Sequence, residues 1–578
     1  MTAIPRSEHP RPDFERDNWM CLNGEWDFSL DEKKFDRKII VPFAFETKLS
    51  GIGDKEFHKT VWYRKTFELP ERMKEKRVIL HFGAVDYACD LWINGRYIRE
   101  HRGGQTSFEA DITEAVMPDD DNVIELKVFD DYEDMEMPRG KQFWEKESRG
   151  IFYTRTTGIW QSVWIEAVEP LYLESCYITP EFDDKCVCFE YNLSKCKASA
   201  VEFSIAFEGK FAACVNAVPN GRKGMVKVQL DQTGLRSWNF EEELAWTPET
   251  PRLFDVEIRT YDEKGVTDLV RTYFGMRKVS VDNGRFMLNN REYYQKLVLD
   301  QGYWEESLLT APTDEAFVKD IELTKAMGFN GVRKHQKVED PRYLYHADRL
   351  GLLVWGELGS AYLYSREYAG RMYSEWIEAV ERDYNHPCII VWTPLNESWG
   401  VQEIKADKYQ QAHCNALMCM IKSVDQSRIV IDNDGWEHTC GELLTIHDYS
   451  DSGAAIRKHF ESVESVLSLC PGRRSLFADG WSYQGQPVML TEFGGVRYVP
   501  GTEVKHSWGY CDASNAEEFA DKYAEIMKAV HESPVIQGYC YTQLTDVEAE
   551  ENGLLTYQRG LKIPLEKIRA INDEDIKE

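Results

Sequence analysis

The sequence predicts a multidomain protein in which two β-sandwiches precede a (β/α)₈ barrel. A chain of 578 residues is too long for one hydrophobic core, because single cores stop growing at roughly 250–300 residues. Short alternating strands fill residues 1–280, and buried strands then alternate with amphipathic helices to the end. We therefore divide the chain into residues 1–168, 169–280 and 281–578.

Residues 1–168 have the alternation of polar and apolar residues that is typical of sandwich strands. Asn94-Gly95 stands between two apolar runs, and both residues tolerate the positive φ of a type I′ turn, which predicts a tight hairpin. The strand candidates are VWYRKTFEL at 61–69, RVILHFGAV at 77–85, LWINGRYI at 91–98, NVIELKVFD at 122–130 and QSVWIEAV at 161–168.

Residues 169–280 continue as short strands with turns between them. The number and spacing of these strands over about 110 residues favour an immunoglobulin-like sandwich. The clearest candidates are CVCFEYNL at 186–193, AVEFSIAFEG at 200–209, MVKVQL at 225–230 and RLFDVEIRTYD at 252–262.

Residues 281–578 contain eight buried strand candidates, the number that a closed barrel requires. Thr313 can cap a helix that ends at Gly328, and Asp340-Pro341 can begin one that ends at Gly351. The candidates end at Asp300 or span 329–334, 352–358, 388–397, 428–434, 443–449, 487–494 and 535–543.

Composition and charge exclude several classes of partner. The formal net charge is −30, so the surface field repels nucleic acids and anionic membranes. No run of about 18 apolar residues occurs, and the opening MTAIPRSEHPRPDF has no signal-peptide core, which predicts a cytoplasmic protein. The 14 cysteines form no C-x-x-C pair, and we expect reduced thiols and neither a metal nor a cofactor.

Polar residues close many of the predicted barrel strands, and the active site of such a barrel lies at the carboxyl ends of its strands. Glutamates that end the fourth and seventh strands, with basic or hydrogen-bonding residues at neighbouring ends, are more typical of a catalytic site than of helix capping. The strand-end residues are Asp300, Arg333, His335, Glu357, Asn396, Glu397, His447, Tyr449, Glu492, Tyr541 and Gln543.

Two of these segments resemble the catalytic motifs of glycoside hydrolase family 2. NHPCIIVWTPLNESWG at 385–400 is similar to the acid/base motif of that family, and PVMLTEFGG at 487–495 is similar to its nucleophile motif. The resemblance spans the chain. CLNGEWDF at 21–28 resembles the opening of the sugar-binding jelly roll of the family, TGIWQSVWIE at 157–166 its last strand, and FGMRKVSVDNGRFMLNN at 274–290 the passage into the barrel.

This resemblance implies a retaining, exo-acting β-glycoside hydrolase. Glu492 would attack the anomeric carbon, and Glu397 would first protonate the leaving oxygen and then activate water. Glu397 then needs a raised pKa, which neighbouring negative charge and the apolar Trp392 and Trp399 would supply. The two carboxylates should lie about 5–5.5 Å apart. We also expect the jelly roll to close one side of the barrel mouth, with RGIFYTRTT at 149–157 reaching the pocket.

The resemblance also implies roles for the neighbouring residues. Asn396 matches the asparagine that binds the sugar 2-hydroxyl, and Arg333 matches the arginine that orients the nucleophile. His335, His447 and Tyr449 fall where relatives contact substrate. The remaining predicted substrate-binding residues are Tyr541 as an aromatic floor, Trp392, Asp300 and Glu357, of which the last two match no definite role.

The sequence departs from the family in two loops. LVLDQGYWEESLLTAP at 297–312 replaces the usual first-strand loop, and ENGLLTYQRGLK at 551–562 lacks the Asn-x-Lys pair with which β-glucuronidases bind the sugar carboxylate. From the frequency of activities in the family, a terminal β-galactoside is the first expectation for the substrate, a β-glucuronide is the second, and a β-mannoside or an arabinoside follows. A transglycosylase and a non-catalytic carbohydrate-binding homologue remain alternatives, and a homo-oligomer is possible.

Overall fold

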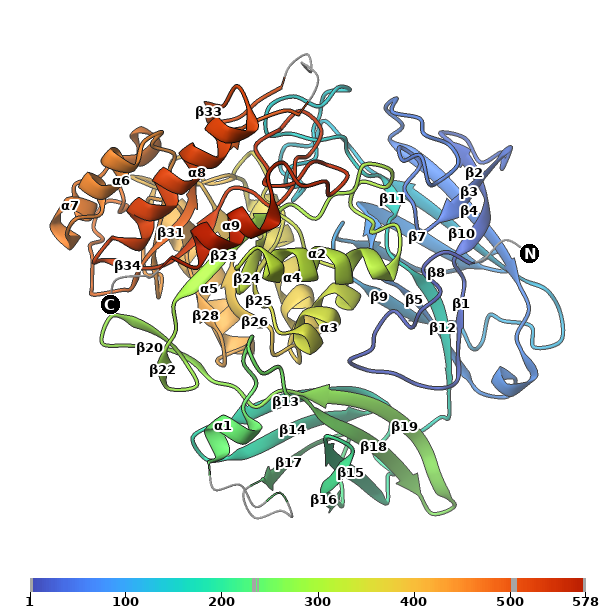
Figure 1. Cartoon of the computed structure of the whole chain (residues 1–578). Helices are drawn as coiled ribbons and strands as arrows, with labels where there is room; N and C mark the ends of the chain where they lie inside the picture. The colour runs from blue at the N-terminus through green and yellow to red at the C-terminus, as the bar shows by residue number, and fades with distance from the viewer. Residues whose placement is uncertain (1–3, 231–234, 236–238, 501–506, 575–578) are drawn as a thin grey trace.

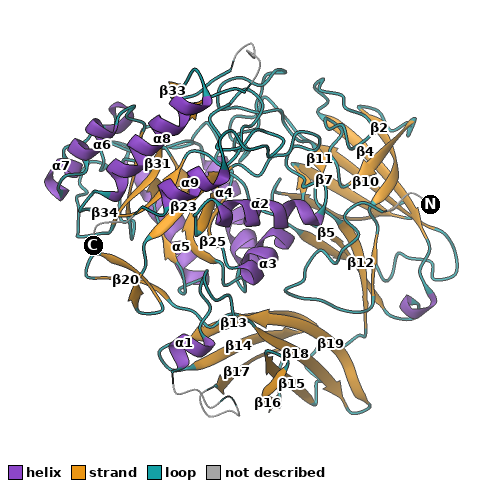
Figure 2. Ribbon diagram, viewed as in Figure 1, coloured by secondary structure: helices purple, strands orange, loops and turns teal. Residues whose placement is uncertain are grey.

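The protein consists of two β-sandwiches and a barrel, seen in a computed structural model that describes residues 4–230, 235, 239–500 and 507–574 (Figure 1). The N-terminal sandwich lies beside the barrel, and the second sandwich lies below both (Figure 2). The fold class predicted from the sequence is confirmed, whereas the domain boundaries at 168 and 280 stay a prediction.

The N-terminal sandwich packs a six-stranded sheet, in the order β3-β2-β4-β10-β7-β8, against a four-stranded sheet, β1-β12-β5-β9. Leu80 of β5 and Leu126 of β10 are fully buried in the core between them. Asn94 (φ 51°) and Gly95 (φ 78°) form the predicted turn between β7 and β8. The strands are β1 Trp19–Cys21, β2 Gly24–Leu30, β3 Arg37–Val41, β4 Thr60–Phe67, β5 Arg77–Phe82, β6 Val85–Asp86, β7 Ala88–Ile93, β8 Arg96–Arg102, β9 Phe108–Asp111, β10 Asn122–Phe129, β11 Gly158–Ile159 and β12 Val163–Val168.

The second sandwich packs the sheet β13-β14-β17 against the sheet β16-β15-β18-β19. Phe189 of β14 and Phe203 of β15 meet across the core with ring centroids 4.9 Å apart. Its elements are β13 Leu173–Glu181, β14 Cys186–Leu193, β15 Ala200–Phe207, β16 Lys210–Ala217, β17 Lys223–Gln229, α1 Phe240–Leu244, β18 Phe254–Asp262 and β19 Gly265–Phe274. A small sheet of β20 Val279–Asp282, β21 Arg285–Leu288 and β22 Arg291–Glu292 leads into the barrel.

All eight predicted barrel strands are present and form one parallel sheet in the order β28-β26-β25-β24-β23-β34-β31-β30. They are β23 Gln295–Asp300, β24 Gly331–Lys334, β25 Leu353–Glu357, β26 Ile389–Thr393, β28 Ile429–Val430, β30 Leu444–Asp448, β31 Val488–Phe493 and β34 Ile536–Tyr541. The short strands β27 Leu395–Asn396 and β29 Asn433–Asp434 pair above β26 and β28, and β32 Val496–Arg497 pairs with β33 Cys511–Asp512.

His438 bridges the remaining gap in the barrel, between β28 and β30. Its Nδ1 lies 2.8 Å from Asp432 Oδ1, and its Nε2 lies 2.7 Å from the carbonyl oxygen of Thr445. These bonds hold the carboxyl ends of the strands in a closed ring, which positions the strand-end side chains around one centre.

The helices cover the outside of the barrel (Figure 2). Asp340 caps α3 by accepting a hydrogen bond from Arg342 N, and Gly351 (φ 75°) ends it as predicted. Thr313 precedes α2 without making a side-chain cap. The helices are α2 Asp314–Ala326, α3 Pro341–Leu350, α4 Arg366–Asp383, α5 Lys408–Val424, α6 Gly453–His459, α7 Val463–Leu467, α8 Ala516–His531 and α9 Leu565–Asn572. Among the described residues, no helix is both long and apolar enough to cross a membrane.

Candidate active site

Arg333, on β24, lies at the centre of the strand-end cluster and is fully buried. Its guanidinium pairs with Glu357, with Asp434 Oδ2 at 2.5 Å and with Glu492 Oε1 at 2.9 Å. Burial lowers the pKa of Arg333, but the three carboxylates raise it well above its usual value. The cluster therefore holds one permanent cation beneath Glu492.

Glu492 ends β31 and is contacted from three sides. Besides Arg333, Tyr449 Oη donates a 2.7 Å hydrogen bond to Glu492 Oε2, and His447 Nδ1 lies 3.4 Å from the same oxygen. The hydrogen bond and the two charged neighbours fix the orientation of the Glu492 carboxylate.

Glu397 follows β27 in a bend of the chain, where Glu397 (φ 52°) and Ser398 (φ 60°) both adopt the left-handed conformation. Its backbone N–H donates to the carbonyl oxygen of Asp434 at 2.9 Å, and its Oε1 lies 2.9 Å from His447 Nδ1. Such strain in two successive residues is frequent where a functional side chain must be aimed.

His447 holds a proton between acidic groups. Burial lowers its pKa, but Glu492 and Asp434 outweigh this effect and raise the pKa of His447 to about 10. The pKa of Glu397 is raised by burial but lowered overall, because His447 donates a hydrogen bond to it and Lys141 and Arg333 add positive charge. The raised pKa of Glu397 expected from the sequence is therefore not found; the proton lies on His447.

The two glutamates are close together. One carboxylate oxygen of Glu397, one of Glu492 and a ring nitrogen of His447 all lie within 4.8 Å of one another. Retaining glycosidases have carboxyl groups about 5–5.5 Å apart, whereas inverting enzymes have them about 6.5–9.5 Å apart. The short separation expected from the sequence is present.

Asn396 and His335 lie beside this pair. Asn396 Oδ1 accepts a 2.7 Å hydrogen bond from Arg333, while its Nδ2 is buried without a hydrogen-bond partner among the described residues. His335 Nδ1 lies 2.8 Å from Arg333 Nη2, and burial together with the charge of Arg333 lowers the pKa of His335 well below its usual value. Both residues are placed where the sequence predicted.

Two predicted substrate contacts are wrong because their side chains leave the barrel interior. Tyr541 packs against Phe493 and against Tyr523 of α8, with ring centroids 5.5 and 4.8 Å away. Trp392 packs against Trp376 of α4 and donates a 2.8 Å hydrogen bond to Asp425. Successive side chains of a strand point to opposite faces, and these two point to the helices.

Asp300 and Glu357 take part in buried ion pairs. Asp300 Oδ2 lies 2.7 Å from Lys334 Nζ, in a second buried cluster on the opposite face of β24 from Arg333. Glu357 accepts hydrogen bonds from Arg333 and from the backbone N–H of Gln336. Asp300 is thus not brought to the site, and Glu357 holds Arg333 in place.

A cavity of about 620 Å³ opens over Glu397, a volume within the range of small-molecule sites. The sequence reasoning missed Trp436 and Tyr510, which form its aromatic walls, and Asp434, which supports Arg333. Trp436 and Tyr510 lie in loops, where no strand periodicity marks them. The further lining residues are His447, Asp448, Tyr449, Ser450, His459 and the segment 468–472.

The chain matches models of one family along most of its length. The model described as glycosyl hydrolases family 2, TIM barrel domain, matches residues 279–569. The sugar binding domain model matches residues 33–167, and a third model of the same family matches residues 171–277. The chain belongs to glycosyl hydrolase family 2. As a family 2 member it is a glycoside hydrolase.

Similar proteins carry different sugar names. A β-galactosidase of Thermoanaerobacter pseudethanolicus is 27% identical over 401 residues, which are 68% of this chain and 52% of that protein, so the match spans about half its length. A Bifidobacterium dentium β-glucuronidase structure has a TM-score of 0.78 at 20% identity, covering 97% of this chain and 98% of that one. A β-galacturonidase structure from Eisenbergiella tayi has a TM-score of 0.76 at 17% identity, covering 100% and 99%. At these identities the structural matches show the fold alone.

The N-terminal domain of this family 2 enzyme reaches the barrel through residues 149–157. Tyr153 Oη donates a short hydrogen bond to Glu550 Oε2, Thr154 Oγ1 donates to Glu548 Oε1 at 2.7 Å, and the ring of Phe152 lies 5.8 Å from that of Trp399. The segment that the sequence singled out therefore contacts loops of the barrel mouth.

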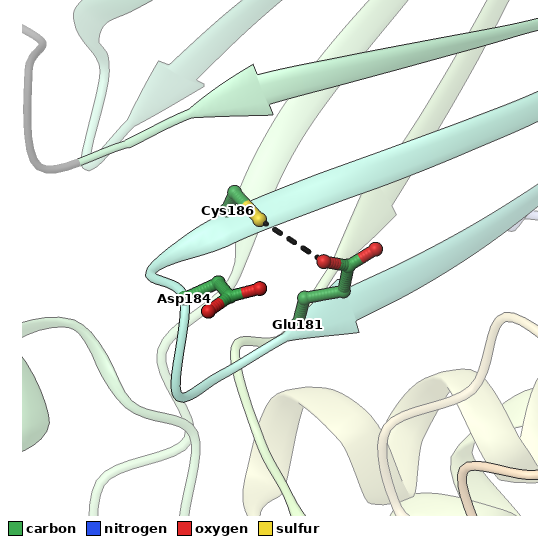
Figure 3. A group of neighbouring side chains, drawn as sticks. All are labelled: Glu181, Asp184 and Cys186. Carbon is green, nitrogen blue, oxygen red and sulfur yellow. Dashed lines mark hydrogen bonds between the residues drawn. The ribbon is translucent and has the colours of Figure 1, made fainter.

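A group of possible metal ligands lies far from this site, at the turn between β13 and β14 (Figure 3). Cys186 Sγ donates to Glu181 Oε2 at 3.4 Å, and Lys227 Nζ pairs with Glu181 and lies 3.6 Å from Asp184. The lysine already offsets one of the two negative charges. The other such group among the described residues is Glu397, His447 and Glu492, where His447 Nδ1 lies 2.9 Å from Glu397 and 3.4 Å from Glu492.

Proposed function

We propose that the protein is a retaining, exo-acting β-glycosidase in which Glu492 is the nucleophile and Glu397 the general acid/base. The observation that carries this proposal is the separation of at most 4.8 Å between their carboxylate oxygens, which leaves no room for a water molecule between base and sugar. The different surroundings of the two groups support this assignment of roles. Glu492 accepts a hydrogen bond from Tyr449 and pairs with Arg333, whereas Glu397 borders the open cavity.

In the first step, Glu492 forms a bond to the anomeric carbon as the bond to the leaving oxygen breaks. That oxygen takes a proton from Glu397. The second step reverses the roles: Glu397 removes a proton from water, the water oxygen bonds to the anomeric carbon, and the ester to Glu492 breaks. Asn396 Nδ2, buried and without a described partner, is placed to donate to a sugar hydroxyl.

The Glu397–His447 pair supplies the proton for the first step. At neutral pH the pair holds one proton, and this proton lies on His447 because the pKa of His447 is raised to about 10 while that of Glu397 is lowered. Transfer along the 2.9 Å bond from Nδ1 to Oε1 leaves a neutral imidazole and a carboxylic acid. Binding of the leaving oxygen at Glu397 then favours the protonated acid.

The terminal sugar that fits this site best is neutral, and we name a β-galactoside first. Glu550, with an exposed fraction of 2%, directly precedes the segment 551–562, which corresponds to the loop that carries the Asn-x-Lys pair in β-glucuronidases. A carboxylate there repels a uronate. The named relative that is a β-galactosidase agrees with this choice. A β-glucuronide is the second candidate, because several similar proteins are named β-glucuronidases.

The test is hydrolysis of a panel of p-nitrophenyl β-glycosides, followed by inactivation with the 2-deoxy-2-fluoro glycosyl fluoride of the best substrate. Mass spectrometry of the peptides should place the covalent sugar on Glu492. A sugar on another residue would contradict the nucleophile assignment, and release of nitrophenol from no member of the panel would favour the non-catalytic homologue. Added sugar acceptors distinguish transglycosylation from hydrolysis by their products.

A further inference from the structure

A short segment of the N-terminal domain, residues 139–142, is built into the barrel mouth. The backbone N–H groups of Arg139 and Gly140 donate to the carbonyl oxygen of Ser360 at 3.2 and 3.0 Å. Gly140 has φ +63°, and a Cβ atom there would lie 2.5 Å from the carbonyl oxygen of Gln336. Only glycine permits this approach, so the next residue, Lys141, has a fixed position.

Lys141 carries a buried cation whose charge is not paired. Its exposed fraction is 7%, and its Nζ lies 5.0 Å from the ring centroid of Trp399, two residues after Glu397. Within the described ranges, no carboxylate oxygen lies within ion-pair distance of Lys141 Nζ, and Nζ donates no hydrogen bond. Burying an unpaired ammonium is costly, whereas a polar ligand would satisfy it.

Glu550 provides the complementary acceptor. It accepts a short hydrogen bond from Tyr153 Oη, on the same N-terminal domain, and one of 3.1 Å from Asn552 Nδ2. Burial raises the pKa of Glu550, the charge of Lys141 opposes this effect, and the charge of Glu492 adds to it. Lys141 and Glu550 thus lie within electrostatic reach of each other and of the catalytic glutamates.

The strand order separates Lys141 from the open cavity. Lys141 is held by loops that follow β24 and β25, whereas the cavity is lined by loops around β30 and β31. Glu550 follows β34, which pairs with β31, so it lies between Lys141 and the cavity in the strand order. In the sheet order, β24 and β30 lie on opposite sides of the barrel. The anomeric carbon must lie between Glu397 and Glu492. A leaving group in the open cavity would direct the sugar ring to the other side of this pair, toward Lys141 and Glu550.

We propose that Lys141 and Glu550 are specificity-determining residues that bind hydroxyl groups of the terminal sugar at the end remote from the scissile bond, Lys141 as donor and Glu550 as acceptor. This inference rests on the proposed function. It extends that function by making the N-terminal domain part of the sugar site. A hydroxyl group satisfies both side chains, because it accepts from an ammonium and donates to a carboxylate.

The experiment measures binding without turnover. Calorimetry with the non-hydrolysable p-nitrophenyl 1-thio-β-D-galactopyranoside is carried out on the full chain, the variants Lys141→Met and Glu550→Gln, and the control Lys146→Met. Lys146→Met removes the same charge from the same loop. Lys146 lies at the surface, however, where it pairs with Glu56 and has 47% of its side chain exposed. We expect about 10- to 100-fold weaker binding for Lys141→Met, about 10-fold weaker binding for Glu550→Gln and no change for the control.

The 3-, 4- and 6-deoxy analogues of the thiogalactoside identify the bound hydroxyl. One of these analogues should bind the wild type more weakly than the parent thiogalactoside does. The same analogue should bind Lys141→Met as well as the parent does, because the substitution has already removed the partner of the missing hydroxyl group. Lys141→Gln keeps a donor and should recover part of the affinity even if the methionine variant folds poorly. Equal losses for every analogue would show that Lys141 only positions Trp399 and would overturn the proposal.

Two further outcomes would also overturn the proposal. A wild-type protein that binds p-nitrophenyl thioglucuronide more tightly than the galactoside, and loses this preference in Lys141→Met, would make Lys141 a carboxylate anchor. A wild-type protein that binds neither probe would contradict the assignment of a neutral terminal sugar to this site. Specific binding without hydrolysis of the oxygen-linked galactoside would contradict the proposed function alone, so the two failures are distinguishable.

Discussion

Replacement of Tyr449 by phenylalanine tests the assignment of Glu492 as the nucleophile. Tyr449 Oη donates the 2.7 Å hydrogen bond to Glu492 Oε2, and the substitution removes only the hydroxyl group. In the proposed mechanism, Glu492 attacks as a carboxylate and becomes an uncharged ester in the glycosyl-enzyme. Its charge returns as the ester breaks. The hydrogen bond therefore stabilises the transition state of deglycosylation relative to the intermediate, and it gives no such advantage to glycosylation.

The size of the effect follows from the contacts that remain. A hydrogen bond to a charged group contributes about 1.5–3 kcal/mol, and 1.36 kcal/mol corresponds to about tenfold in rate. Arg333 at 2.9 Å and His447 at 3.4 Å still contact Glu492 in the variant, which places the loss at the lower end. We expect deglycosylation to slow about 10- to 30-fold, with glycosylation nearly unchanged.

The assay is stopped-flow hydrolysis of a dinitrophenyl β-glycoside, whose good leaving group makes glycosylation fast. Tyr449→Phe should show a burst of one equivalent of phenolate, then a slow steady rate, with kcat and KM falling together and kcat/KM conserved. Tyr483→Phe is the control, because its hydroxyl donates only to the carbonyl oxygen of Gln486. A variant that loses kcat/KM as much as kcat and gives no burst would refute the reasoning.

Three other predictions follow from the same geometry. Glu397→Gln should turn over activated aryl glycosides about 100-fold more slowly or worse and be rescued by azide to the β-glycosyl azide, whereas Glu492→Ala should give the α-azide; NMR of the product tells whether the two roles are exchanged. Trp436→Ala, which opens the cavity wall, should weaken sugar acceptors in transglycosylation about 3- to 10-fold while aryl hydrolysis is kept, and an equal loss of both would contradict an aglycone site. Because the folded pKa of His447 is raised from 6.5 to about 10, its proton stabilises the fold fully below about pH 6.5 and the effect is lost as pH rises to 10. The difference in urea midpoint between wild type and His447→Gln should shrink over that range, and a constant difference would show that His447 is not charged in the folded protein.

The sequence by itself determined the eight barrel strands and the two glutamates. Glu397 and Glu492 follow unbroken apolar strands, and strand ends converge in a parallel barrel, so position in the sequence already implied proximity. Arg333, Asn396 and His335 were found by the same reasoning, and all three lie in the cluster. Strand order predicted their place, and the resemblance to family 2 supplied their proposed roles.

The tertiary structure decided which face each strand-end residue presents. Tyr541 and Trp392 stand one residue away from inward positions, and a shift of one residue turns a side chain to the other face. The pairing register between barrel strands shifts near their carboxyl ends. One shift lies between Ile446 and His447 of β30, and after it His447 pairs with Glu492 of β31. Polarity alone cannot report such a shift, because Tyr and Trp are accepted both in a core and in a sugar site.

The position of Lys141 at the barrel mouth depends on the packing of the two domains alone. It is separated by more than 250 residues from Trp399 and by more than 400 from Glu550, and no periodicity links a loop of one domain to the mouth of another. Sequence patterns report local structure, since they depend on which face of a strand or helix is buried. The contacts between domains depend on how the surfaces of the folded domains fit together. The sequence therefore predicted the proposed catalytic pair, and only the tertiary structure brought a cation from the N-terminal domain near it.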